Sequence, residues 1–118
     1  MKKAILCATA GLILAGCQST MGHVPAITAD QAVITQAQQA LEKYDDFINV
    51  DDSGLITFTR TLPMDYVWAP VEIKKISRQV ACDDLRFFVD RGMVVKMVFE
   101  GQRGRVDYFD QQRCIDEF

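Results

Sequence analysis

Residues 93–110 read Met-Val-Val-Lys-Met-Val-Phe-Glu-Gly-Gln-Arg-Gly-Arg-Val-Asp-Tyr-Phe-Asp, and this stretch decides the fold. Apolar side chains alternate with more polar ones over Val95–Glu100, which is the period of a β-strand with one buried face. The segment Gly101–Gly104 is rich in turn formers, and Val106 and Tyr108 then share one face of a returning strand. The stretch therefore predicts a β-hairpin. Its strands are expected at residues 93–100 and 105–110.

A second hairpin is predicted upstream, on either side of the turn formers Asp51–Gly54. Ile56 and Phe58 alternate with threonines after this turn, as in a strand with one face in water. Gly54 can adopt the positive φ that such a turn needs. The strands are expected at residues 47–50 and 55–62.

The same turn partly matches a calcium-binding loop, because Asn49, Asp51 and Ser53 stand where such a loop has its first ligands. The twelfth position would be Arg60, where that loop requires a bidentate glutamate. A cation in a ligand position defeats the match. The sequence has no Cys-x-x-Cys pair, and its one histidine, His23, lies far from the cysteines, so we expect no metal site.

Residues 29–44 are expected to form an amphipathic helix. Thr28 and Gln31 match a capping box, with Thr28 as the N-cap. Apolar side chains then recur at helical spacing and predict one face packed on the sheet: Val33, Ala37, Ala40, Leu41 and Tyr44.

Two further helices are predicted between the hairpins. Pro70 suits the first turn of the first helix. Its apolar stripe consists of Ile73, Ile76 and Val80. The stripe loses phase at Asp83, so we expect Asp83 to cap a second short helix, residues 84–91, which Gly92 closes. The inward side chains of this second helix are Leu85, Phe88 and Val89.

The adjacent carboxylates of Asp83 and Asp84 could instead suggest acid–base chemistry. No other catalytic residue type accompanies them, and helix capping explains the pair better. We therefore do not expect an enzyme.

The order helix, hairpin, helix pair, hairpin predicts an α+β fold over residues 28–118. We expect a single domain with a small, mostly antiparallel sheet of about four to five strands flanked by helices. The connector Pro63–Pro70 carries Met64, Tyr66 and Trp68 in alternation. These side chains either pack under the helices or form an exposed docking ledge for a partner, since Trp and Tyr are favoured interface anchors.

The N-terminus has the pattern of an export signal. A basic start is followed by the apolar run Ala4–Ala15, which is too short to span ~30 Å of hydrocarbon. Leu14-Ala-Gly-Cys17 resembles the lipobox of bacterial lipoproteins. The resemblance implies that residues 1–16 are a signal peptide and that Cys17 carries a covalent lipid, with no other cofactor expected. The alternative is an ordinary secretory signal that happens to contain Cys17.

Charge and composition narrow the location further. Residues 17–27 would form a lipidated polar tether. Without the signal, the chain has 11 Lys and Arg against 16 Asp and Glu, since only Lys2 and Lys3 are lost. This acidic balance argues against nucleic acid and leaves membrane attachment to the lipid. Gln18 follows the lipidated cysteine, which by resemblance to lipoproteins indicates the periplasmic face of the outer membrane.

The remaining cysteines fit an oxidising compartment. Cys7 would leave with the signal and Cys17 would carry lipid, which leaves Cys82 and Cys114 as an even pair. We expect them to form one disulfide, although two buried thiols are the alternative. Closing a loop of this length would stabilise the fold by roughly 3.5–4 kcal/mol.

The C-terminal half resembles the α/β pilotins of type II secretion. The resemblance covers residues 72–114 in motif and the rest of the chain in layout. It lies in Gln79-Val-Ala-Cys-Asp-Asp-Leu85, Phe88-Val-Asp-Arg-Gly92, Met93-Val-Val-Lys-Met-Val-Phe99, Gly101-Gln-Arg-Gly-Arg105 and the closing Cys114. The spacing of the cysteines is somewhat shorter here than in that family, and the first hairpin region is also shorter.

The resemblance implies a binding protein rather than a catalyst. Pilotins hold an amphipathic helix near the C-terminus of a secretin subunit and carry that subunit to the outer membrane. The partners expected are therefore a secretin C-terminal segment and, through Cys17, the membrane. Two alternatives stay open: a periplasmic enzyme inhibitor of the lysozyme type, which would present the Gly101–Gly104 loop, and an accessory protein of an envelope machine.

Overall fold

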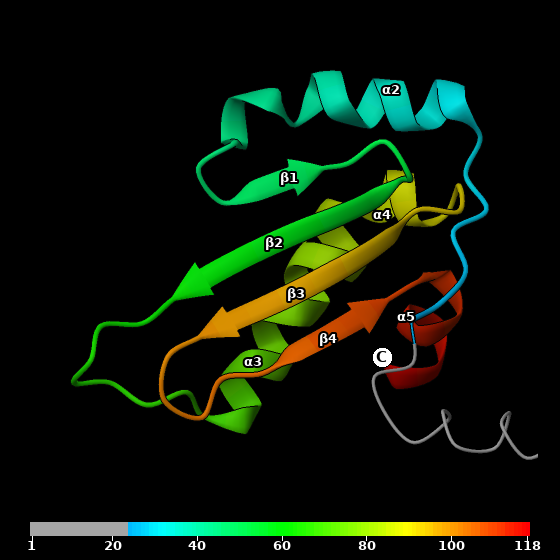
Figure 1. Cartoon of the computed structure of the whole chain (residues 1–118). Coiled ribbons are helices and arrows are strands. Elements are labelled where there is room, and N and C mark those ends of the chain that lie inside the picture. Colours follow the sequence, from blue (N-terminus) through cyan, green and yellow to red (C-terminus); the bar gives the residue numbers. More distant parts are fainter. Residues whose placement is uncertain (1–23) are drawn as a thin grey trace, which may run out of the picture.

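The computed structural model describes residues 24–118, which form a four-stranded sheet in the order β1-β2-β3-β4 (Figure 1). The bounds of the strands are β1 Ile48–Val50, β2 Leu55–Thr61, β3 Val94–Glu100 and β4 Val106–Phe109. Both predicted hairpins are present, because β1 pairs with β2 and β3 with β4 in antiparallel fashion. The predicted α+β class with a mostly antiparallel sheet is confirmed.

The centre of the sheet is parallel. All seven residues of β2 pair with β3, from Leu55 opposite Val94 to Thr61 opposite Glu100. The helices between the two hairpins carry the chain from the end of β2 back to the start of β3, so the second hairpin begins in the same direction as β2. β2 and β3 are the two central strands, and β3 buries Val94, Val95, Met97 and Phe99 while Lys96 and Val98 remain partly exposed.

Helices cover one face and both edges of this sheet. Figure 1 shows α3 and α4 crossing behind the sheet, α2 running along the β1 edge and α5 beside β4. The helical bounds are α2 Gln31–Ala40, η2 Glu42–Tyr44, α3 Pro70–Ser77, η3 Arg78–Asp84, α4 Arg86–Val89 and α5 Gln111–Glu117. In the described residues, no helix is long and apolar enough to cross a membrane.

The core lies between the covered face of the sheet and the crossing helices. The sheet contributes Ile56, Phe58, Val95, Met97, Phe99 and Phe109. The helical layer contributes Ile73, Ala81, Leu85, Phe88 and Val89. The inward positions expected in β2 and β3 are therefore confirmed, whereas Val106 and Tyr108 share the partly exposed face of β4 and its buried residue is Phe109. The opposite face of the sheet carries Thr57, Thr59, Lys96, Val98 and Tyr108, which remain partly exposed.

The first helix begins later than the sequence predicted. Its N-cap is Asp30, whose carboxylate accepts a hydrogen bond from the Val33 amide at 3.3 Å, and the predicted cap Thr28 is wrong. The Thr28 amide instead donates to the Gly92 carbonyl at 2.9 Å, which holds the chain extended before α2. The buried stripe is Ile34, Ala37 and Leu41, whereas Ala40 and Tyr44 are exposed.

The phase slip near Asp83 has a different cause from the one predicted. The chain does not stop for a cap but widens into the π-helical segment η3, in which the Leu85 amide donates to the Val80 carbonyl five residues earlier at 2.9 Å. The predicted N-cap Asp83 is therefore wrong. Gly92 does close α4, with a φ of 99° and Met93 donating to the Phe88 carbonyl.

Two segments differ from the expected linker and tail. Of the predicted tether, residues 24–27 are described, and they do not stand apart from the domain: Pro25 and Ala26 line a hollow with β4 and α5. The C-terminal helix α5 was not predicted. Asp110 caps it by accepting a hydrogen bond from the Arg113 amide at 2.9 Å.

Candidate binding groove

The predicted cysteine pair is formed. Cys82 of η3 and Cys114 of α5 are joined by a disulfide, with their Cα atoms 5.6 Å apart. The bond ties the helical layer to the element that follows the last strand. The predicted lipidation residue Cys17 lies outside the described residues, so its modification stays a prediction.

The structure separates the three side chains of the predicted docking ledge. Trp68 is only 4% exposed, its indole N–H donates to the Glu100 carbonyl at 2.9 Å, and its ring packs edge-on against Phe99. Trp68 is therefore part of the core and does not share a surface with its neighbours. Met64 and Tyr66 remain at the surface, with 86% and 59% of their area exposed.

The connector and the second hairpin turn form one tip. The Trp68 amide donates to the Gln102 carbonyl at 2.9 Å, and the Gln102 side chain donates back to the Met64 carbonyl at 2.6 Å. Two loops far apart in sequence therefore support each other. Met64 and Tyr66 are exposed at this tip, and neither lines the disulfide cleft or the hollows described below.

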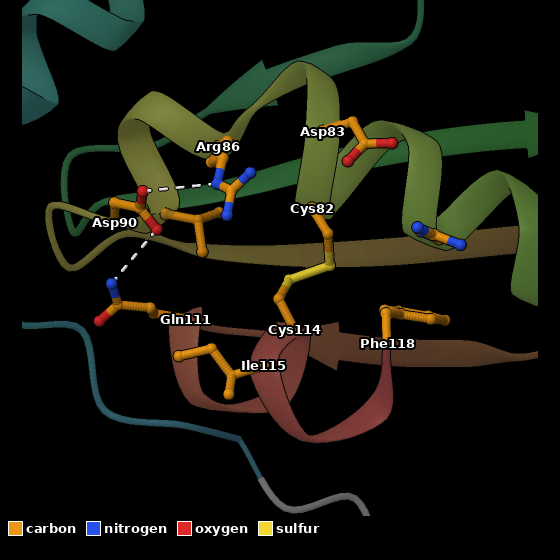
Figure 2. Close-up of a pocket in the computed structure, with 10 residues that line it drawn as sticks. Cys82, Asp83, Arg86, Asp90, Gln111, Cys114, Ile115 and Phe118 are labelled. Carbon is orange, nitrogen blue, oxygen red and sulfur yellow. Dashed lines mark hydrogen bonds and ion pairs between the residues drawn. A yellow bond between two sulfur atoms is a disulfide. The ribbon is translucent and has the colours of Figure 1, made fainter.

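A polar cleft of about 380 Å³ surrounds the disulfide (Figure 2). Figure 2 shows Arg86 and Gln111 directed toward Asp90 from opposite sides, at 3.7 Å and 3.3 Å. The contact of Gln111 with Asp90 joins α5 to the end of α4 beside the Cys82–Cys114 bond, whereas the Arg86–Asp90 pair lies within the α4 turn. The cleft is thus the joint between two helices, and its side chains are largely engaged with one another.

The element α5 is held by more than the disulfide. The guanidinium of Arg113 donates to both carboxylate oxygens of Asp107, at 2.6 and 3.2 Å, and to the Tyr108 carbonyl at 2.8 Å. It also reaches Glu117 at 3.2 Å. The hydrogen bond to Asp107 is the main reason that the pKa of Arg113 is raised above its ordinary value.

An apolar groove of about 320 Å³ lies on the other side of η3, toward the β1 edge. One wall comes from the end of α2, from η2 and from β1, and the other wall comes from η3. Its lining consists of Leu41, Tyr44, Phe47, Ile48, Phe58, Val80, Asp84 and Leu85. We call this set the β1-edge groove. Asp84 is the one charged residue in this lining.

Two aromatic rings stand at the mouth of the β1-edge groove. Tyr44 and Phe47 are 39% and 42% exposed although both rings are large and mostly apolar. Their centroids are 5.9 Å apart, and Phe47 packs edge-on against the buried Phe58 at 5.8 Å. The rings are therefore fixed by the core on one side while their other side faces solvent, which is the arrangement of an interface anchor.

A well-ordered turn supports the β1 wall. The Asp51 carboxylate accepts hydrogen bonds from the Ser53 hydroxyl at 2.6 Å, from the Ser53 amide at 2.9 Å and from the Leu55 amide at 3.1 Å. These bonds, chiefly that of the Ser53 hydroxyl, lower the pKa of Asp51. The turn fixes the register of β1 on β2 and thereby the position of Phe47 and Ile48.

The groove and the N-terminal entry of the chain lie at opposite edges of the sheet. Pro25 and Ala26 lie against β4 and α5 in a hollow of about 630 Å³, whereas the groove lies beside β1. Figure 1 shows the first described residues beside α5, across the sheet from the end of α2. The first described residues therefore lie away from the groove.

Residues 24–118 contain no group of three or more His, Cys, Asp or Glu side chains that could hold a metal ion. Comparison of the chain with protein-family models, curated proteins and solved structures finds no match.

The sequence predicts the elements that carry the groove residues, but it does not predict that these residues form a groove. Tyr44 was assigned to the buried stripe of a helix that in fact ends at Ala40, and Phe47 to the first hairpin. One feature of the sequence indicates an exposed aromatic pair at this position. The acidic residues Asp45 and Asp46 lie between Tyr44 and Phe47, and charged side chains are rarely buried at the end of a helix.

Proposed function

We propose that this chain is a lipid-anchored binding protein that holds an apolar helical segment of another protein in the β1-edge groove. The observation that supports this most strongly is a pre-formed apolar groove whose mouth carries two exposed aromatic rings, Tyr44 and Phe47. Amphipathic helices bind such grooves by inserting side chains from one face, spaced at i, i+3, i+4 and i+7.

The packing of the groove floor supports tight binding of such a helical segment. The groove floor includes Ile48 and Phe58 of the sheet and Leu85 of the helical layer, all of which belong to the core. A floor of this kind does not have to rearrange before binding, so less of the interaction energy is lost in ordering it. The groove volume lies at the lower end of the range for ligand sites, which suits the side chains of one helical face.

We propose the C-terminal segment of a secretin subunit as the segment that is held, so that the chain acts as a pilotin of type II secretion. The resemblance of residues 72–114 to pilotins and the lipobox ending at Cys17 support this choice. The lipid would supply the outer-membrane address, and the position of the groove at the edge away from the N-terminal entry would keep it accessible to the subunit being carried.

A titration tests the proposal directly. The full-length protein in detergent is titrated with a synthetic peptide of the secretin C-terminus from the same cell, followed by fluorescence anisotropy of a labelled peptide. We expect saturable binding with a micromolar or lower Kd. No saturable binding to the peptide would contradict the proposal.

The membrane part of the proposal needs a separate test. Replacing Cys17 by Ser removes the lipid attachment site while leaving residues 24–118 unchanged. We expect the variant to leave the membrane fraction and the secretin to lose its outer-membrane location. If the variant and the secretin both remain in the outer membrane, the carrier role is wrong even where the peptide binds.

A second candidate is the enzyme inhibitor of the lysozyme type. The supporting observation is the braced tip, in which the Gly101–Gly104 turn is tied to Met64 and Trp68 and exposes Gln102 and Arg103. A rigid projecting loop is what a substrate cleft could accept. A lysozyme inhibition assay with the parent protein and with Arg103→Ala separates this candidate from the first, since only an inhibitor would slow the enzyme and lose the effect in the variant.

A further inference from the structure

The mouth of the β1-edge groove carries an excess of acidic side chains. Asp84 lines the groove directly, on the η3 wall. On the opposite wall Asp45 and Asp46 occupy the turn between the two aromatic residues of the mouth, and Glu42 lies one turn earlier in η2. All four side chains are exposed, and within residues 24–118 none of them forms an ion pair.

Two cations lie near the same mouth, and both are placed against aromatic rings. Lys43 lies 5.3 Å from the ring centroid of Tyr44, and Arg60 lies 5.8 Å from that of Phe58. Four acids against two bases leave the rim negative. The other cations of the described chain lie elsewhere: Lys74, Lys75, Arg78 and Arg86 on α3, η3 and α4, Arg91 in the turn after α4, Lys96 on β3, Arg103 at the tip, Arg105 before β4 and Arg113 on α5.

We propose that the β1-edge groove selects an apolar helix flanked by Lys or Arg residues. The inference rests on the proposed function and specifies the chemistry of the segment held. Apolar side chains of the helix face contact the groove lining, and basic residues at the helix flanks face Asp84 on one wall and Asp45 and Asp46 on the other. An acidic flank would face the same carboxylates and be repelled.

Charge also decides between a partner and a second copy of this chain. In a twofold dimer through this groove, the rim of one copy would face the same rim of the other, and the carboxylates of Asp45, Asp46 and Asp84 would be brought together. The entry of the N-terminal segment beside β4 places the start of the described chain at the other edge of the sheet. A basic segment of a different protein fits the rim best.

The rim acts on selectivity more than on total affinity. Exposed ion pairs contribute little individually, and salt screens them within about 10 Å at 0.1 M ionic strength. Several such pairs acting together are expected to change the Kd by about tenfold at low salt, mainly through the association rate. The apolar floor would supply the salt-independent remainder.

The experiment uses three synthetic helical peptides with one apolar face in common and with Lys, Gln or Glu at both flanks. Each is titrated into the full-length protein in detergent, at low and at high salt. We expect the Kd to rise from Lys to Gln to Glu flanks, with about tenfold between the extremes at low salt and little difference at high salt.

A matched pair of variants locates the effect. Asp45→Asn with Asp46→Asn removes two rim charges and should abolish most of the preference for Lys flanks. Asp65→Asn with Glu72→Gln removes the same charge from the tip and from α3, and should leave the preference unchanged. An equal effect of the two double variants would show a general charge effect and overturn the inference.

The outcomes distinguish this inference from the proposed function. If all three peptides bind with the same Kd and no salt dependence, the rim does not select and the inference falls, while the apolar groove stands. If none of the peptides binds and the secretin peptide also fails, the proposed function falls with it. Preference for the Glu-flanked peptide, or dimerisation through the groove that the peptide cannot displace, would also overturn the inference.

Discussion

The π-helical segment η3 has a helical neighbour on each side, and the two sides differ. Toward α5 it is joined by the Cys82–Cys114 disulfide, and beside that bond Asp90 contacts Arg86 and Gln111. Toward the end of α2 no cross-link is formed within the described residues, and apolar side chains face each other across the β1-edge groove. The disulfide fixes η3 from the α5 side, and the groove lies on the side that has no such bond.

This difference shows how a small domain can carry an exposed apolar groove. A domain of this size buries too little surface to be very stable, and open apolar surface adds to the problem. The covalent bond and the bidentate contact of Arg113 with Asp107 lie at the β4 edge, where no groove is needed. The disulfide and the proposed binding surface thus lie on opposite sides of η3, the disulfide toward the β4 edge and the groove toward the β1 edge.

The largest expected effect comes from removing the disulfide. Changing Cys82 and Cys114 together to Ser should lower the free energy of unfolding by roughly 3.5–4 kcal/mol, because the unfolded chain regains the freedom of the closed loop. Urea unfolding of the parent and the variant measures the loss. Under conditions where the variant is still folded, its affinity for the secretin peptide should fall by less than about threefold.

A parallel loss of stability and of peptide affinity in this folded variant would contradict the separation of the two edges. Reduction of the parent protein by a dithiol should reproduce the stability loss and serves as the control for the substitutions themselves.

The next largest effect is on binding. Phe47→Ala removes an anchor ring at the mouth of the groove and should weaken peptide binding by about 2 kcal/mol, or roughly 30-fold. The control is Tyr66→Ala, which removes an aromatic ring that is also exposed but lies at the tip. Anisotropy titration should show no change for this control. A larger effect of Tyr66→Ala than of Phe47→Ala would move the binding surface to the tip, as the alternation of Met64, Tyr66 and Trp68 suggested.

A smaller effect is expected from the second attachment of α5. Arg113→Met keeps most of the apolar stem but removes the hydrogen bonds to Asp107, and should cost about 1 kcal/mol, since both side chains are partly exposed and the pair is screened. Arg105→Met is the control, because Arg105 is more exposed and its nitrogen lies 3.7 Å from Asp107. Urea unfolding should rank the two variants in this order, and the reverse order would show that the bidentate geometry does not contribute.

The smallest effect concerns the turn that supports the groove. The folded pKa of Asp51 lies below the ordinary value of 3.8, so its charged form stabilises the fold above that pH, and the contribution is lost as the pH falls through the folded pKa. Asp51→Asn should therefore cost roughly 0.5 kcal/mol at neutral pH and progressively less in acid. The pH dependence of unfolding of the two proteins gives the difference. A difference that stays constant with pH, or that appears equally in Asp52→Asn, would contradict this assignment.

The sequence predicts the sheet better than it predicts the helices. Strand faces follow from local alternation, so Ile56, Phe58, Val95 and Met97 were placed correctly on the buried face. The parallel pairing of β2 with β3 could not be derived, because it depends on the path of a long crossover rather than on the strands themselves. The number of strands was within the expected range because both hairpins follow from the same local alternation of apolar and polar residues.

The helix ends depend on contacts that a local pattern does not contain. Thr28 has the right residue type for a cap, but its amide is taken by the Gly92 carbonyl, and Asp30 takes over. The π-helical widening at Val80–Leu85 adds one residue to a turn and gives the same break in phase as a new helix. Trp is a favoured residue type at interfaces, but Trp68 is buried because its indole N–H donates to the Glu100 carbonyl and its ring packs against Phe99.

The candidate groove was missed because it is a property of three elements together. Its lining comes from the end of α2 with η2, from the first hairpin and from η3, and extends in sequence from Leu41 to Leu85. Only the tertiary arrangement brings Tyr44 and Phe47 opposite Val80 and Leu85.

The central claim is that the β1-edge groove, and not the tip or the disulfide cleft, holds the partner helix. The most direct measurement is the change in backbone amide chemical shifts of the full-length protein in detergent when the Lys-flanked peptide is added. The account predicts the largest changes at residues 41–48 and 80–85. Largest changes at residues 64–67 and 101–104, or at the α5 residues Gln111–Glu117, would contradict it.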